Sequence, residues 1–126
     1  MNDVWVGDIT DMRDLFSQRP FNGDISRWDV SKVKDMGYMF YKSAFDGDIS
    51  DWDVSNVIYM NSMFNNCNNL TSLDVSGFNT SNATDMGFMF SRTAATTIKG
   101  LENFNTSNVT DMGYMFHVSK ATSLNL

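Results

Sequence analysis

The chain has 126 residues, a net charge of −6 and a pI near 4.4, and 42% of its residues are hydrophobic. This length fits one domain with its own core, while the acidic balance disfavours nucleic acid and anionic membranes, which select clustered Lys and Arg. A single cysteine, Cys67, excludes an internal disulfide. No stretch is apolar and long enough for membrane insertion, and no signal peptide is visible.

One short stretch of the form Met-x-x-Met-Phe recurs along the chain. Its first methionine stands at positions 12, 36, 60, 86 and 112, so successive copies are 24, 24, 26 and 26 residues apart. The clearest copy is Asp35-Met36-Gly37-Tyr38-Met39-Phe40, and the copy at 11–16 is degenerate, with Leu15 at the second methionine position. A fixed period in this range predicts a solenoid.

The hydrophobic period changes within each copy. Residues 25–30 carry β-branched and aromatic side chains that partly alternate, which favours extended chain. Apolar residues then fall at 33, 36, 39 and 40, a spacing that places them on one face of a helix and also fits a short 3₁₀ turn. The segment Leu70-x-x-Leu73-x-Val75 has the strand pattern of a leucine-rich repeat. We therefore expect an α/β solenoid of about five coils, each a short strand, a corner and a short helix.

The repeat boundaries divide a single solenoid domain over residues 1–126. The expected parts are an N-terminal capping coil at 1–20, repeats at 21–44, 45–68, 69–94 and 95–120, and the start of a further coil or an edge strand at 121–126.

The repeated units resemble a known family. The units GDISRWDVSKVKDMGYMF (23–40) and LTSLDVSGFNTSNATDMGFMF (70–90) are similar to the repeats of BspA-like leucine-rich-repeat surface proteins, which include the amphipathic repeat lipoproteins of mycoplasmas. The resemblance runs from about Val4 to Leu126 and departs only in the first copy, where residues 4–8 replace the Trp-Asp-Val-Ser pattern. It implies a cell-surface or secreted location and a role in adhesion or protein binding, and it supplies no catalytic residues.

An aromatic residue stands between the two methionines in three of the copies. On a regular α-helix this position lies about 200° from the first methionine, so the row would face away from the core and form a candidate protein-binding face. The alternative is an irregular turn in which these rings cover a loop or a neighbouring coil. Specificity is expected at variable outward positions and in the return loops 41–45, 65–69 and 91–100. The candidate binding residues are Tyr38, Phe88, Tyr114, Tyr59, Arg27 and Asp51.

Two columns of acidic residues recur at the strand positions. Stacked in register, their carboxylates would repel one another, and Ca²⁺ could relieve that repulsion because it takes several oxygen ligands. The alternative is that these side chains make local hydrogen bonds in turns. The columns comprise Asp24, Asp48 and Asp74, and Asp29 and Asp53.

The sequence offers no catalytic constellation. With His117 as its only histidine, it can build neither a histidine metal site nor a His-based triad. The methionines fit a core better than a soft-metal site, and no cofactor motif occurs. We expect a non-catalytic module that binds a protein or a host surface component, with self-association through open solenoid ends. The alternatives are a structural spacer or stalk, and Ca²⁺-assisted surface binding.

Overall fold

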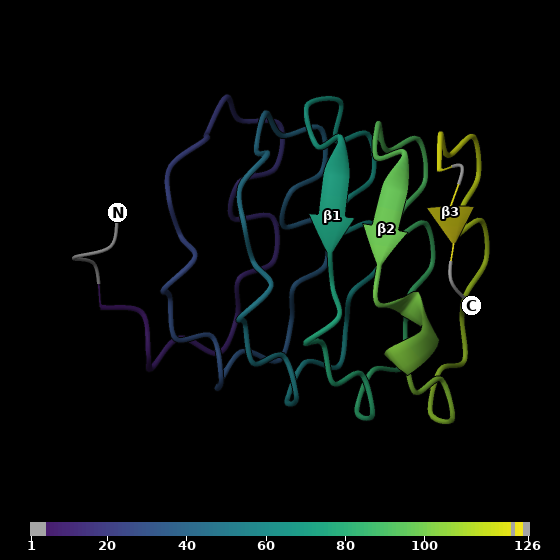
Figure 1. Ribbon diagram of the computed structural model, residues 1–126. Helices are drawn as coiled ribbons and strands as arrows, with labels where there is room; N and C mark the ends of the chain where they lie inside the picture. The colour runs from purple at the N-terminus through teal and green to yellow at the C-terminus, as the bar shows by residue number, and fades with distance from the viewer. Residues whose placement is uncertain (1–4, 122, 125–126) are drawn as a thin grey trace.

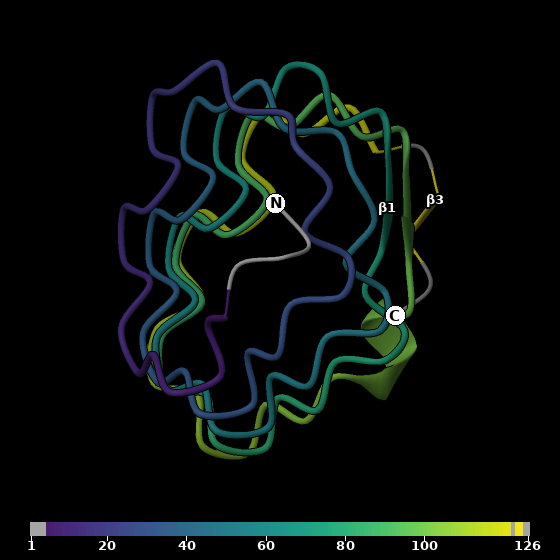
Figure 2. The same ribbon diagram turned by 90° about the vertical axis from the view of Figure 1, so that its left-hand side faces the viewer.

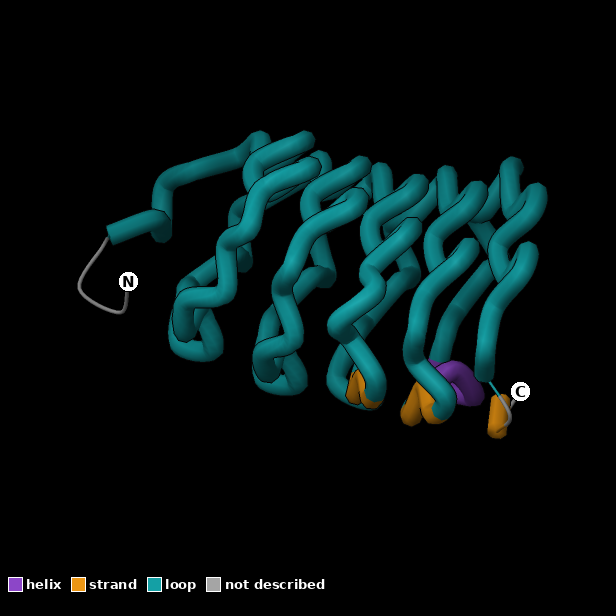
Figure 3. Tube along the Cα trace, turned by 90° about the horizontal axis from the view of Figure 1, so that it is seen from above, coloured by secondary structure: helices purple, strands orange, loops and turns teal. Residues whose placement is uncertain are grey.

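A computed structural model describes residues 5–121 and 123–124 of the protein. The chain passes repeatedly around one axis, and the successive passes, here called windings, lie side by side (Figures 1 and 3). Viewed along the stack, the later windings nearly superimpose (Figure 2). Val4, Thr122, Asn125 and Leu126, which the repeat pattern also includes, lie outside the described residues.

Regular secondary structure is confined to a few short elements. They are strand β1 (Ser72–Asp74), strand β2 (Thr97–Lys99), the 3₁₀ helix η1 (Leu101–Asn103) and strand β3 (Ser123–Leu124). The strands form one parallel sheet in the order β1-β2-β3. In its register Leu73 lies opposite Ile98, and Ile98 lies opposite Leu124.

The predicted α/β solenoid of five coils, each with a short strand, a corner and a short helix, is therefore wrong. Within residues 5–121 and 123–124 there is no α-helix, and the helix η1 has three residues. The strands have two or three residues each. With so few regular elements among the described residues, the predicted descriptions leucine-rich repeat, solenoid and repeat protein are not supported either.

The backbone at the Met-x-x-Met-Phe stretch explains why no helix forms there. Tyr38 has a φ of 57°, a left-handed conformation that interrupts a right-handed helix. The N–H of Met39 instead donates to the carbonyl of Met36 over 3.2 Å. Because positive φ falls on the third residue of this turn and not on Gly37, the turn is of type II. The equivalent residues of the other copies have φ between 55° and 61°: Asp14, Ser62, Phe88 and Tyr114.

Backbone hydrogen bonds alternate between local turns and the next winding. The even-numbered N–H groups from Met36 to Lys42 donate to the odd-numbered carbonyls of residues 59–65, over 2.9–3.0 Å. The odd-numbered N–H groups from Met39 to Ser43 close turns with carbonyls three residues back. This pattern satisfies the buried backbone without helices or long strands. Single parallel bridges also join neighbouring windings in the series Asp11, Asp35, Tyr59, Asp85 and Asp111.

The core is built from the apolar columns of the repeated stretch. Met36, Met39 and Phe40 are fully buried, as are their equivalents in the next two windings. The prediction that the methionine columns belong to the core is thus confirmed except in the last winding, where Met112 is 46% exposed. The phenylalanine rings form one stack through the windings, with neighbouring centroids 5.6–5.8 Å apart and planes 6–19° apart. Its members are Phe16, Phe40, Phe64, Phe90 and Phe116.

Candidate functional site

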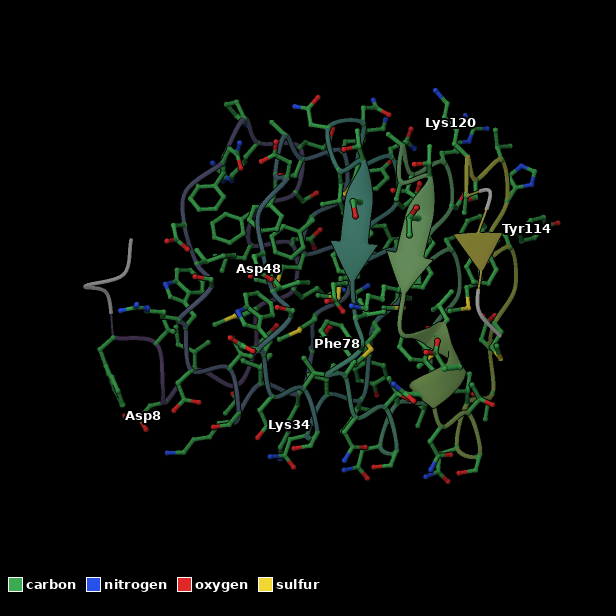
Figure 4. The ribbon with its side chains drawn as sticks, in the orientation of Figure 1. Asp8, Lys34, Asp48, Phe78, Tyr114 and Lys120 are labelled. Atoms are coloured by element: carbon green, nitrogen blue, oxygen red, sulfur yellow. The ribbon has the colours of Figure 1, made fainter. Side chains whose placement is uncertain are left out.

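The aromatic residues between the methionines reach the surface from type II turns, not from the outer face of a helix. Phe88 is 42% exposed and Tyr114 is 64% exposed. Their rings stack with centroids 5.1 Å apart and planes 17° apart. Tyr114 projects from the C-terminal end of the stack, whereas Phe78 is directed into it (Figure 4). The structure thus brings two of the three predicted aromatic residues into one surface pair.

Tyr38 belongs to a separate cluster. The rings of Tyr38 and Tyr41 pack edge to face, with their centroids 5.4 Å apart. The guanidinium of Arg13 lies 5.2 Å from the centroid of the Tyr38 ring. The intervening winding has Ser62 at the equivalent position, and this side chain is buried. The predicted aromatic row is therefore interrupted between Tyr38 and the Phe88–Tyr114 pair.

An open depression of about 630 Å³ lies beside this pair. Besides the two rings, its lining includes Lys42, Asn66 and Arg92. A second depression of about 390 Å³ adjoins it, shares Lys42 and Asn66, and is also lined by Arg19. We call the two together the cationic trough. Among the described residues, no Asp or Glu lines either depression.

The cationic trough follows a second column of left-handed residues. Lys42, Asn66 and Arg92 stand six residues after the first methionine of their copies, with φ of 52°, 59° and 55°. Their N–H groups donate in turn to the carbonyls of Asn65, Ser91 and His117, over 2.8–3.0 Å. Each link advances one winding, so Lys42 and Arg92 lie two windings apart in one column. At the usual spacing of paired chains their backbones are about 10 Å apart.

Three other predicted binding residues lie elsewhere. Tyr59 is exposed and forms backbone bridges with Asp35 and Asp85. Arg27 and Asp51 are exposed at equivalent positions, each one residue before a buried tryptophan. None of the three predicted residues lines the cationic trough.

The carboxylates of the two acidic columns accept local hydrogen bonds within turns. Asp24, Asp48 and Asp74 each accept a hydrogen bond through Oδ1 from the N–H of the serine two residues later, over 2.8–3.0 Å. Asp29 and Asp53 do the same over 3.0 Å. Within the part of the chain that the structure describes, no group of three or more His, Cys, Asp or Glu residues is placed to hold a metal ion.

These hydrogen bonds also favour the charged carboxylates. The hydroxyl and the N–H of Ser76 lower the pKa of Asp74. Ser31 and Ser50 lower the pKa values of Asp29 and Asp48 in the same way. For Asp48, the neighbouring carboxylates of its column oppose this effect without reversing it. Asp29, Asp48 and Asp74 are thus charged turn residues (Asp48 is labelled in Figure 4).

Cys67 is buried, and its Sγ donates to the carbonyl of Phe40 over 2.9 Å. Burial raises the pKa of this thiol to about 12. At neutral pH the group is a protonated, covered thiol rather than a nucleophile, because the thiolate is the reactive form.

The sequence predicted three of the loops that line the cationic trough, but neither its cations nor the segment that carries Arg19. The return loops 41–45, 65–69 and 91–100 include Lys42, Asn66 and Arg92. Their shared offset of six residues from the first methionine is visible in the sequence. That offset would have placed them in one column, but the absence of acidic residues around them depends on the winding geometry.

Comparison with known proteins gives one family. The family described as "Mycoplasma protein of unknown function, DUF285" matches residues 3–98, which is more than half of the chain. The chain matches no curated protein and no solved structure. Within residues 5–121 and 123–124, no helix has the length and apolar character needed to cross a membrane. The chain therefore belongs to the mycoplasma family DUF285, whose function is unknown.

Proposed function

We propose that this chain is a non-catalytic binding or adhesion module of a surface protein, of the BspA-like kind that its repeated units resemble. The observation that carries the proposal is the exposed Phe88–Tyr114 pair beside a trough whose described lining residues include cations and no Asp or Glu. Exposed aromatic surface marks interaction sites, and aromatic residues and arginine are enriched in interfaces. Because the chain has a net charge of −6, the charge of this surface is opposite in sign to that of the chain as a whole.

The described side chains give little support to catalysis. A general acid or base requires a pKa near the working pH, but hydrogen bonds lower the pKa values of Asp8, Asp29, Asp48 and Asp74. The thiol of Cys67 is buried and protonated. Binding therefore accounts for the exposed groups better than an enzymatic reaction does.

The core supports binding by holding the turns that carry these groups. The phenylalanine stack fixes the windings from inside, while backbone hydrogen bonds fix the column of Lys42, Asn66 and Arg92. A ligand that meets a preorganised surface loses less free energy to the ordering of side chains and loops. The proposed mechanism is thus distributed contact with a preformed face.

Binding of the 126-residue protein to host-cell surfaces and to purified host surface components tests this proposal. The double variant Phe88→Ser/Tyr114→Ser removes the aromatic pair, and Tyr59→Ser is the matched control because Tyr59 is exposed but lies away from the trough. We expect the double variant to lose at least about tenfold in affinity, since two aromatic contacts are removed, while the control retains binding. Equal binding by the double variant and the parent, or no binding by the parent, would overturn the proposal. Thermal melting of each variant verifies folding.

A further inference from the structure

We propose that the ligand of the cationic trough is an acidic polysaccharide, a linear polymer of sugars that carries carboxylate or sulfate groups. This inference rests on the proposed binding function and names the chemistry of its ligand. It draws on three features of the trough: its charge, the direction of its cation column, and its combination of aromatic and amide side chains.

The charge of the trough is opposite to that of the whole chain. The sequence has 15 acidic residues and nine Lys or Arg residues. Nevertheless, Arg19, Lys42 and Arg92 line the two depressions, and no described acidic residue does. Because a recessed surface of one sign concentrates ligands of the other sign, the trough selects an anion from solution.

The cations follow the axis of the stack. The N–H of Gln18, which precedes Arg19, donates to the carbonyl of Tyr41. The N–H of Lys42 donates to the carbonyl of Asn65. The same ladder continues through Asn66 to Arg92, at about 4.8 Å for each winding. A small anion would contact one of these positions, whereas a linear polyanion laid along the axis would contact all of them. The column therefore favours an extended ligand with recurring charges.

The uncharged groups of the trough suit a sugar. The Phe88–Tyr114 pair presents aromatic surface against which the C–H face of a sugar ring can pack. Beside it, Asn66 Nδ2 donates to Asn65 Oδ1 over 3.0 Å. Each amide also has further donor or acceptor capacity for hydroxyl groups. Aromatic rings, amides and cations together match the apolar face, hydroxyls and acidic groups of such a polymer.

An acidic peptide fits the lining of the cationic trough less well. Protein partners are held mainly by side chains that enter well-packed, desolvated pockets. In the larger depression, Phe88 is the one described lining residue whose side chain has no polar atom. The trough is open and polar, so it offers a peptide charge contacts but no apolar anchor site.

Calorimetric titration of the full chain tests the inference with five probes: heparin, hyaluronate, neutral dextran, poly-glutamate and a DNA duplex. We expect binding to heparin or hyaluronate that weakens as salt is added, and no binding to dextran. Heparin and hyaluronate separate sulfate from carboxylate recognition, and a DNA duplex serves as a further polyanion. Lys42→Gln and Arg92→Gln should each weaken binding by about fivefold, the effect of one screened charge contact. Lys34→Gln, exposed and away from the trough, is the matched control.

The outcomes separate this inference from the proposed function. Equal affinity for dextran, tighter binding of poly-glutamate or DNA, or unchanged binding by the Lys42 and Arg92 variants would overturn the polysaccharide inference. If a host surface protein binds through Phe88 and Tyr114 while no acidic polysaccharide binds, the inference fails and the proposed function stands. If no host component and no probe binds, both fail.

Discussion

The ring of Phe64 stacks on that of Phe40 with centroids 5.7 Å apart and planes 7° apart. On its other side Phe64 stacks on Phe90 at 5.8 Å and 6°. Each ring comes from a different winding, so this contact joins segments that are 24 and 26 residues apart in sequence. In a protein with so little regular secondary structure, the stack and the backbone ladder beside it hold neighbouring windings in register.

Replacement of Phe64 by alanine should remove the centre of this stack. The side chain is fully buried, so we expect a loss of about 3–5 kcal/mol in the free energy of unfolding, the usual cost of a buried Phe→Ala change. Phe116→Ala is the matched control, because Phe116 is only partly buried and stacks on Phe90 in the last winding. Urea unfolding followed by tryptophan fluorescence measures both. Equal losses at the two positions would contradict a stack that is strongest at its centre.

The left-handed turns predict an unusual order of stability at Phe88. Its φ is 57°, a region that glycine enters freely but that costs an L-residue about 1–2 kcal/mol. Phe88→Gly should therefore be more stable than Phe88→Ala by about 1 kcal/mol, although both lose the same ring. In the helix predicted from the sequence the order would be reversed, because glycine costs about 1 kcal/mol there. Urea midpoints of the two variants decide between the two backbones.

The periodic spacing of apolar residues predicted the core, but not the backbone that forms it. Met36 and Phe40 are buried as their spacing requires, yet this spacing suits both a helix and a series of tight turns. Residue type was misleading at the decisive point, since Tyr38 takes the positive φ and the adjacent Gly37 does not. Gly37 instead permits close approach, because a Cβ there would lie 2.9 Å from Oδ1 of Asn61 in the next winding.

The candidate site was predicted in part for a related reason. Phe88 and Tyr114 stand out in the sequence because they occupy the same offset between the two methionines of their copies. Lys42 and Arg92 lie 50 residues apart, and only their shared offset from the first methionine of their copies relates them in the sequence. Only the alignment of windings through the backbone ladder brings these cations beside the aromatic pair.

Gly100 should tolerate substitution poorly. Its φ is 100°, and an added Cβ would lie 2.7 Å from the Cβ of Ser76 in the preceding winding. Gly100→Ala combines backbone strain with a steric clash, so we expect a loss of at least about 2 kcal/mol, within the range for strained residues. Gly113→Ala is the comparison: its Cβ would meet only the exposed carboxylate of Asp111, at 3.1 Å. Comparable unfolding free energies for the two variants would contradict the close approach at Gly100.

The buried thiol of Cys67 should make stability depend on alkaline pH. Its pKa is raised from 9.0 to about 12, because burial disfavours the thiolate. The neutral form thus stabilises the fold fully below pH 9, and this contribution is lost as pH rises from 9 toward 12. Within that window one such group lowers stability by up to about 1.4 kcal/mol per pH unit. Other groups also titrate there, so a variant that lacks only this thiol is needed.

Cys67→Ser supplies that variant, since the serine hydroxyl stays neutral in this range and retains a donor for the carbonyl of Phe40. Urea midpoints at pH 8 and pH 10.5 should fall further for the parent than for the variant. In the folded parent at pH 8, iodoacetamide should also react with Cys67 far more slowly than in urea, because the thiolate is both scarce and covered. A parallel fall in the two midpoints together with rapid alkylation of the folded protein would show that the thiol is exposed. In that case the windings around Phe40 and Cys67 could not be packed as closely as the 2.9 Å contact between Sγ and the carbonyl requires.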